Sequence, residues 1–165
     1  MTELPPSPPL APVADYVFYS NQNDATGSFN RAEDPYTGLP NITNEELKNM
    51  TVYTDNGFIP LYNDDKLTEL AGLQTYTDNV IRIKLPDESF IGSLNAQYSF
   101  SFPNGVINTV FSALGATDDE GYPLVNIPIV CNIIGGAGAF LNAKGVVVLD
   151  TIVFRGLSKV SIFLE

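Results

Sequence analysis

The sequence feature that most constrains the fold is the stretch from Ile127 to Phe154, IPIVCNIIGGAGAFLNAKGVVVLDTIVF, in which a glycine cluster separates two segments. Valine, isoleucine and phenylalanine dominate both segments, and such side chains fit a pleated, partly buried surface better than a helix. Gly135, Gly136 and Gly138 stand where the chain bends or admits another backbone closely, because a Cβ would obstruct either. The stretch therefore predicts a strand, a sharp bend and a longer strand.

The glycine cluster does not fit a phosphate-binding loop. A dinucleotide loop needs the pattern G-x-G-x-x-G at the start of a helix, and a P-loop ends in Lys followed by Ser or Thr. Counted from Gly136, the sixth position is Leu141, and residues 146–149 are Val-Val-Val-Leu, which predicts a strand. No helix N-terminus is then offered to a phosphate. We interpret the cluster as a strand bulge or a barrel corner.

The charge balance narrows the possible partners. The chain has 165 residues, 44% hydrophobic and 16% charged, which suggests one ordered globular domain. Its 8 basic and 19 acidic residues give a net charge of −11, so we expect no binding to nucleic acid or to an anionic membrane. No run of about 18 apolar residues is present to span a bilayer. The N-terminus lacks the basic start and apolar core of a signal peptide, so we expect a soluble protein, intracellular or in a virion.

Two residue counts exclude several classes of enzyme. Histidine is absent, which removes Ser-His and Cys-His nucleophilic pairs, histidine bases and almost every zinc or non-haem iron site. Cys131 is the only cysteine, and its place among Ile and Val favours a small buried side chain over a reactive thiol. The acidic run 118–120 lacks the alternating spacing of a calcium loop, so a solvated turn is favoured. We expect neither a metal nor a cofactor.

Helical signals are few. Five prolines between Thr2 and Val13 favour an extended arm, either mobile or laid across a neighbouring subunit. Residues 20–40 carry turn chemistry throughout. Thr43 and Glu46 have the spacing of a capping box, which predicts one short helix, and residues 64–71 predict one or two helical turns.

Most other segments predict strands. Over residues 96–102, alternation with period two places Tyr98, Phe100 and Phe102 on one face. Over residues 80–85, the same alternation separates the isoleucines from two cations. The expected strands are 15–19, 51–53, 58–62, 80–85, 96–102, 106–113 and 159–164, with turns at Asp55-Asn56-Gly57 and Pro103-Asn104-Gly105.

About eight strands joined by turns indicate an antiparallel sandwich or barrel. A barrel is preferred because closure removes edges, and few of these strands carry edge-protecting charges. We expect a proline-rich arm over residues 1–13 and a single β-barrel domain over 14–165. From 146 to 154 both faces are apolar apart from Asp150 and Thr151, so one face fills the barrel and the other needs cover, most simply from another subunit.

Four motifs occur in order between Tyr16 and the C-terminus. They are YVFYSNQND at 16–24, AGL at 71–73, YSFSF at 98–102 and IIGGAGAFLNAKGVVVL at 133–149. Together they resemble the allene oxide cyclase family, relatives of the dirigent proteins, whose motifs are Y-V-Y-E-x-N-x-x-D, AGL, Y-S-F-Y-F and ITGGAG-x-F-x-x-A-x-G. The resemblance implies an eight-stranded antiparallel barrel, commonly a homotrimer, with a mostly apolar pocket at one mouth.

The resemblance also implies which residues would line that pocket. Plant cyclases of the family carry a glutamate on the first strand that stabilises the cationic rearrangement of a fatty-acid epoxide, and the matching position here is Tyr19. Asn21 and Asn63 match two pocket asparagines, Gln74 replaces a pocket cysteine, and Lys144 replaces an aromatic residue. A neutral phenol cannot replace the several kcal/mol that a carboxylate supplies to a developing cation. The resemblance therefore implies a pocket without the family's own catalytic acid.

Each candidate also has a simpler structural interpretation. Tyr19 fits a core aromatic residue whose hydroxyl is hydrogen-bonded. Asn21 and Asn63 flank predicted turns, where asparagine commonly bonds nearby backbone. Lys144 is either a pocket cation or a charge at the barrel rim, where Asp150 or another acid is a possible partner.

Three functions remain open from the sequence. The preferred one is a non-catalytic trimeric barrel with a structural or interaction role, such as a component of a larger assembly or virus particle. It is motivated by the lost glutamate, the absence of histidine and the two-sided apolar strand. The second is a cyclase or isomerase that folds a polyene or lipid in an apolar pocket, without metal or histidine. The third is a carrier for a small apolar ligand, and the fold alone does not choose among them.

Overall fold

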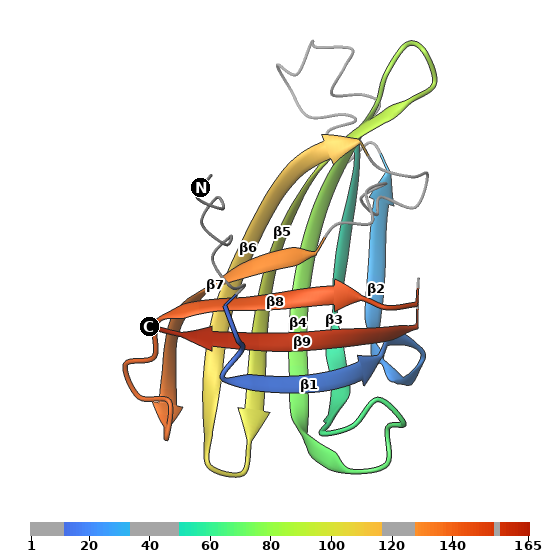
Figure 1. Cartoon of the computed structure of the whole chain (residues 1–165). Coiled ribbons are helices and arrows are strands. Elements are labelled where there is room, and N and C mark those ends of the chain that lie inside the picture. The colour runs from blue at the N-terminus through green and yellow to red at the C-terminus, as the bar shows by residue number, and fades with distance from the viewer. Residues whose placement is uncertain (1–11, 34–49, 117–127, 154–155) are drawn as a thin grey trace, which may run out of the picture.

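The computed structural model describes residues 12–33, 50–116, 128–153 and 156–165, and these ranges are all-β (Figure 1). The elements are β1 (Tyr16–Asn21), the short 3-10 turn η1 (Gln22–Asp24), β2 (Thr26–Glu33), β3 (Met50–Tyr62), β4 (Leu70–Lys84), β5 (Phe90–Phe102), β6 (Gly105–Ala116), β7 (Ile129–Gly138), β8 (Gly145–Thr151) and β9 (Leu157–Leu164). The expected arm up to residue 11, the capping box at Thr43 and Glu46, and the acidic run 118–120 lie outside the described ranges.

The strands form the predicted eight-stranded antiparallel barrel, with one strand added. Within the described ranges the sheet order is β1-β9-β8-β7-β6-β5-β4-β3-β2, and a further pairing between β1 and β3 closes it. β1 touches β3 where Tyr19 faces Tyr62, whereas β2 pairs with residues 51–58 along the same edge of β3. In Figure 1, β1, β8 and β9 cross the lower part of the long strands β3 to β6. The long strands therefore continue beyond the closed part of the barrel.

Residues 51–62 form one continuous strand rather than the predicted hairpin around Asp55-Asn56-Gly57. The middle of β3 is paired on both sides, so that Gly57 faces Gly27 of β2 and Tyr76 of β4. A Cβ at Gly57 would clash with the backbone carbonyl of Thr26, so glycine here permits the close approach of β2. Pairing with two neighbours thus overrides a local turn signal.

Two further segments differ from the expectation. Residues 26–33 form β2, although 20–40 predicted turns throughout, because the edge of β3 supplies hydrogen-bond partners that local sequence does not reveal. Residues 64–71 form no helix: the Asp64 carboxylate accepts hydrogen bonds of 2.9 to 3.3 Å from three backbone N–H groups just after it. That local bonding holds a turn between β3 and β4.

The glycine-centred stretch forms two strands and a bend, as predicted, but the first strand is the longer, with 10 residues against 7. The register between β6 and β7 shifts between Asn108 and Thr109, where Ile134 is the extra residue. This shift confirms the bulge interpretation. Gly138 has a φ of +64°, and from it the chain passes through turns directly into β8. No helix begins at the glycines in this described stretch.

Alternate residues of the strands fill the barrel. The expected shared face of Tyr98, Phe100 and Phe102 is confirmed, because the first two are buried and Phe102 packs against the core. Phe18 stacks on Phe102 with ring centroids 4.7 Å apart, which closes one end of the interior. The buried core cluster is Leu61, Leu94, Ala96, Tyr98, Phe100, Ile107, Cys131, Phe140, Val147, Val160 and Ile162. Among the described residues, none belongs to a helix with the length and apolarity needed to cross a membrane.

Candidate active site

Two aspartates face each other on the inner side of the barrel wall. Asp55 of β3 and Asp78 of β4 are register partners, so both side chains leave the sheet on the same face. That face is the inner one, because Tyr53, two residues before Asp55, and Ala96, the partner of Asp78 on β5, are both buried. Directly opposed residues have Cβ atoms about 4.5 to 5.5 Å apart, and like charges at that spacing repel. Two carboxyl groups are thus held together where only one of them ionises easily.

A tyrosine hydroxyl completes the group. Tyr98 of β5 lies diagonally across from Asp78, is 6% exposed, and donates a hydrogen bond from its hydroxyl to the Asp78 carboxyl. The Oδ1 atom of Asp78 is buried without a hydrogen-bond partner. A buried acceptor left unsatisfied costs about 1 to 3 kcal/mol. The arrangement therefore carries an unfavourable free energy that packing alone does not explain.

Burial sets the protonation state of the pair. Burial, reinforced by the negative charge of Asp55, raises the pKa of Asp78 to about 7, against the opposing effect of the Tyr98 hydrogen bond. Burial also raises the pKa of Asp55, against a backbone hydrogen bond at Asn56. Because the two groups interact, their protons belong to the pair, and the more deeply buried Asp78 takes up the shared proton first. Near pH 7 the site thus holds one exchangeable proton.

Tyr98 serves as a donor and not as a base. Burial first, and then the charge of Asp78, hold the pKa of Tyr98 well above its usual range. The hydroxyl of Thr109 donates to the backbone carbonyl of Tyr98 at 3.2 Å, which ties β6 to β5 at this point. The phenol therefore stays neutral and fixed beside Asp78 at physiological pH.

Cys131 lies on the same inner face and takes no part as a nucleophile. Its side chain is fully buried, as the sequence predicted, and burial raises the pKa of its thiol to about 12, opposed by a hydrogen bond with Thr109. The thiolate is the reactive form of cysteine, and it is not populated near neutral pH.

The arrangement is suited to proton transfer. Asp55 and Asp78 are both half-buried on the inner face. General acid–base catalysis is most efficient when the pKa of the group lies near the working pH, which is where Asp78 lies. In the described part of the chain, His, Cys, Asp and Glu side chains form no cluster of three or more that suits a metal ion. The chemistry that these residues offer is therefore to remove and return a proton.

Of the five predicted pocket residues, Gln74 alone lies on the inner face, and Tyr19, Asn21 and Asn63 lie on β1 or in the turn after β3. Tyr19 lies between Phe18, which packs on the core, and the buried Ser20, so alternation turns it to the outer face. Asn21 caps η1 by accepting a 3.0 Å hydrogen bond from the backbone of the next turn. Asn63 is exposed in the turn after β3. The backbone-bonding role that turn chemistry suggests is observed at Asn21.

The two other predicted pocket residues lie on different elements, Gln74 on β4 and Lys144 between β7 and β8. Gln74 is 5% exposed on the inner face of β4, with Ile59 and Phe100 as its register partners, four residues before Asp78. Lys144 is exposed in the turn between β7 and β8. The structure thus does not bring the five predicted residues into one pocket.

Lys144 borders a hollow between the end of β7 and the start of β8. The hollow has a volume of about 630 Å³ and forms where β7 leaves β8, beyond their last register pair at Asn132 and Val146. The backbone carbonyl of Lys144 accepts a 3.1 Å hydrogen bond from the N–H of Glu165. The lining residues are Asn132 to Gly136, Asn142 to Val146 and Glu165. This hollow is separate from the acid pair, and neither aspartate lines it.

The acid pair is not apparent from the sequence. Turn chemistry at Asp55-Asn56-Gly57 predicts a hairpin there, and residues 74–79 lie in none of the predicted strands or helices. The available signal was the alternation over 74–82, which places Gln74, Tyr76, Asp78, Val80 and Arg82 on one face. Three of the five residues on that face are polar, so hydrophobicity does not identify it as an inner face.

Comparisons with known proteins name no family. No family model matches the chain, and no curated protein matches it. A solved structure described as pyocyanin demethylase has 15% sequence identity and a TM-score of 0.42, covering 90% of this chain and 98% of its own. That similarity is too low to assign the site a function.

Proposed function

We propose that this protein is an enzyme that shifts a proton within a small, largely apolar substrate in the barrel lumen, as an isomerase or cyclase does. The observation that carries the proposal is the Asp55–Asp78 pair on the inner wall with Tyr98 hydrogen-bonded to Asp78. Strongly perturbed carboxyl groups with a specific charged partner occur preferentially at functional sites. The carboxyl groups on the inner face are thus Asp55 and Asp78, whereas Tyr19, which the resemblance matches to the family's glutamate, lies on the outer face.

The two aspartates act as a general base and a general acid. The ionised carboxylate of the pair accepts a proton from one atom of the substrate, and the protonated carboxyl returns a proton to another atom. The substrate keeps its composition and its electrons, so the reaction needs no cofactor. Tyr98 orients the Asp78 carboxyl and stabilises its ionised form through the hydroxyl hydrogen bond. The surrounding apolar side chains keep bulk water from competing for the proton.

The test uses a panel of β,γ-unsaturated ketones and acids, whose conversion to the conjugated isomers is followed by ultraviolet absorbance. The wild-type protein is expected to convert at least one of them, and Asp78→Asn is expected to slow that conversion about 10² to 10⁴-fold, the usual contribution of a general acid or base. Asp65→Asn, in an exposed turn, is the matched control and should leave the rate unchanged. Conversion by Asp78→Asn at the wild-type rate, or no conversion of any compound, would count against the proposal.

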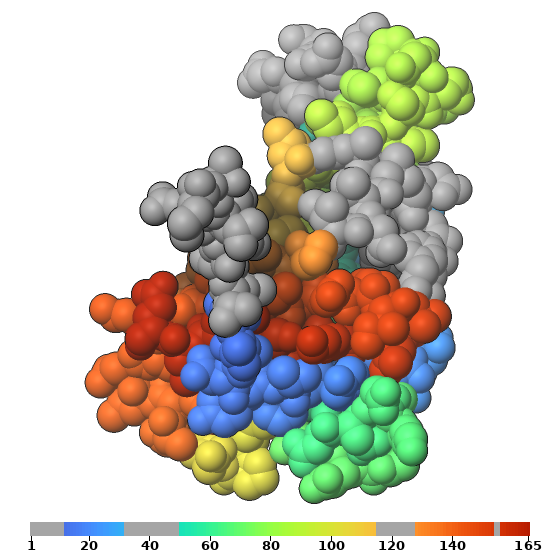
Figure 2. Space-filling model, in the orientation of Figure 1, coloured from blue at the N-terminus to red at the C-terminus, as the bar shows by residue number. Residues whose placement is uncertain are grey.

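A structural role in an oligomer is a second candidate, supported by a row of three valines, interrupted by Ser161, on the outer face. Val17, Ser161, Val148 and Val130 are successive register partners across β1, β9, β8 and β7. Val17 and Val130 are 36% and 49% exposed. Figure 2 shows β1, β8 and β9 forming a continuous surface across the lower part of the molecule. Apolar patches of this kind mark association surfaces, and the family resemblance suggests a trimer.

The oligomer is tested by sedimentation equilibrium in native buffer. The wild-type chain is expected to sediment as a trimer, and Val130→Asp to shift it to monomer, because the substitution buries a charge in the contact. Thr77→Asp, on the outer face of β4, is the control and should not change the mass. A wild-type monomer at micromolar concentration would remove this candidate.

A further inference from the structure

A buried arginine lies on the same inner wall as the acid pair. Arg82 of β4 follows Asp78 by four residues and is 5% exposed. Its register partners are Thr51 on β3 and Gly92 on β5. Arginine is almost never buried to this extent unless its charge is paired.

Arg82 lacks such a partner in the described part of the chain. Its Nη1 atom is buried and makes no hydrogen bond, and Nη2 donates only to the Thr51 hydroxyl at 3.5 Å, a weak bond. The guanidinium carbon instead lies 4.3 Å from the ring centroid of Phe90 and 5.3 Å from that of Tyr53. These contacts hold the guanidinium in place and leave its charge uncompensated by an anion.

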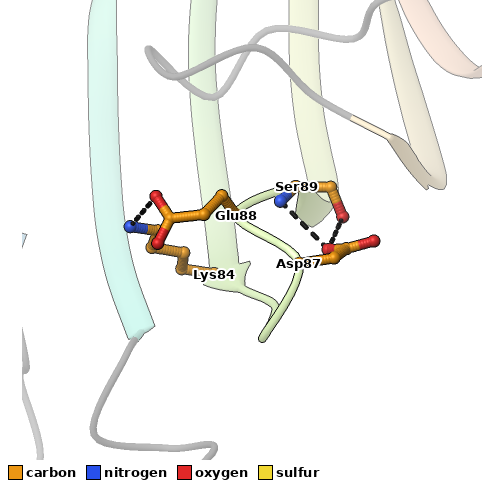
Figure 3. Close-up of polar contacts among 4 residues, drawn as sticks. All are labelled: Lys84, Asp87, Glu88 and Ser89. Carbon is orange, nitrogen blue, oxygen red and sulfur yellow. Dashed lines mark hydrogen bonds and ion pairs between the residues drawn. The ribbon is translucent and has the colours of Figure 1, made fainter.

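The next cation along β4, Lys84, is paired with an acid, in contrast to Arg82. Lys84, two residues further along β4, forms a 2.8 Å ion pair with Glu88 in the turn that leads to β5, where Asp87 also accepts hydrogen bonds from Ser89 (Figure 3). A second guanidinium, that of Arg31 on β2, lies 5.5 Å from the centroid of the Tyr53 ring. Two guanidinium groups therefore lie against one tyrosine ring.

We propose that Arg82 binds the carboxylate of an amphipathic ligand that lies along the inner wall of the barrel. A carboxylate matches the planar fork of arginine and supplies the acceptors that Nη1 and Nη2 lack. Between Arg82 and Asp78 the wall is apolar, because Val80 and its partner Leu94 occupy the intervening step. The inner face thus presents a cation, an apolar step and then the acid pair.

The spacing suggests how such a ligand would meet the acid pair. Four strand residues correspond to about 13 Å along the wall. A monocarboxylate with an apolar chain of that length would place its far end beside Asp55 and Asp78. This identification of the substrate as an amphipathic carboxylate rests on the proposed function, whereas carboxylate binding at Arg82 does not depend on any reaction.

The test measures binding of decanoate and of its neutral counterpart decanol by isothermal titration calorimetry. Wild-type protein is expected to bind decanoate more tightly than decanol. Arg82→Met should weaken decanoate binding roughly ten- to hundredfold, the range for losing hydrogen bonds to a charged group, and leave decanol binding unchanged. Lys84→Met removes a cation from the same strand, one already paired with Glu88, and should change neither affinity.

Equal affinity of the wild type for decanoate and decanol, or undiminished decanoate binding by Arg82→Met, would overturn the inference. If Arg82→Met does not fold, NMR of the wild-type protein provides the test. Decanoate should shift the side-chain N–H resonances of Arg82, and decanol should not. Asp78→Asn is expected to keep decanoate binding. Loss of isomerisation with retained binding therefore tests the proposed function separately, and loss of binding with retained isomerisation refutes only the carboxylate site.

Discussion

Asp78→Asn is expected to raise the free energy of unfolding at pH 8 by about 4 kcal/mol, at about 1.4 kcal/mol for each pKa unit between the ordinary value of 3.8 and about 7. Asparagine has nearly the shape of a protonated aspartate and still accepts the Tyr98 hydroxyl, so the contacts change little. What the variant removes is the free energy needed to ionise a carboxyl group beside Asp55 in the barrel interior.

The sign of this change in the free energy of unfolding follows from the number of protons that the folded and unfolded states bind. The pKa of Asp78 is higher in the folded protein than in the unfolded chain, so the folded state binds more protons between about pH 4 and 7. Wild-type stability should fall as the pH rises through that window and level off above it. The difference between variant and wild type should accordingly be near zero at pH 4 and largest at pH 8.

Urea unfolding at both pH values measures this difference, with Asp65→Asn as the exposed control. Taking the difference between variant and wild type is necessary because other carboxyl groups titrate in the same range. Asp55 is one of them, because burial raises its pKa against the effect of a backbone hydrogen bond at Asn56. A variant no more stable than wild type at pH 8 would mean that Asp78 ionises freely in the fold.

The barrel was predictable because its signals are local. The bend at Gly138, the two-residue turn before Gly105 and the alternation over 96–102 each lie within a few residues of sequence. These signals fix strand direction and inner face without knowledge of the partners. The strand β2 was not predictable, because residues 26–33 become a strand only through the edge of β3.

The acid pair depends on register and was therefore hidden. Asp55 and Asp78 meet only because β3 runs straight through a segment with strong turn chemistry. The adjoining part of β4 also reverses the usual pattern, since Ile81 is 37% exposed and Arg82 is 5% exposed. Where the inner face of a strand only forms core, hydrophobicity identifies that face correctly. It fails along the part of β4 that contains Asp78 and Arg82, where we place the site.

The family resemblance predicted five pocket residues, and the structure does not bring them together. Tyr19, Asn21 and Lys144 occupy matching motif positions, yet the first two are placed on or beside the outer face of β1 and the third in a turn. Gln74 is the one of the five that lies on the same inner face as Asp78, four residues before it on β4.

The shared proton of Asp55 and Asp78 is tested most directly by an NMR titration of the Asp78 side-chain carboxyl carbon in the wild-type protein. We expect a titration midpoint near pH 7, moving to lower pH in Asp55→Asn, because that change removes the negative neighbour. A midpoint near the ordinary value of 3.8, unchanged in Asp55→Asn, would show that the two carboxyl groups do not share a proton and would contradict the proposed proton-transfer site.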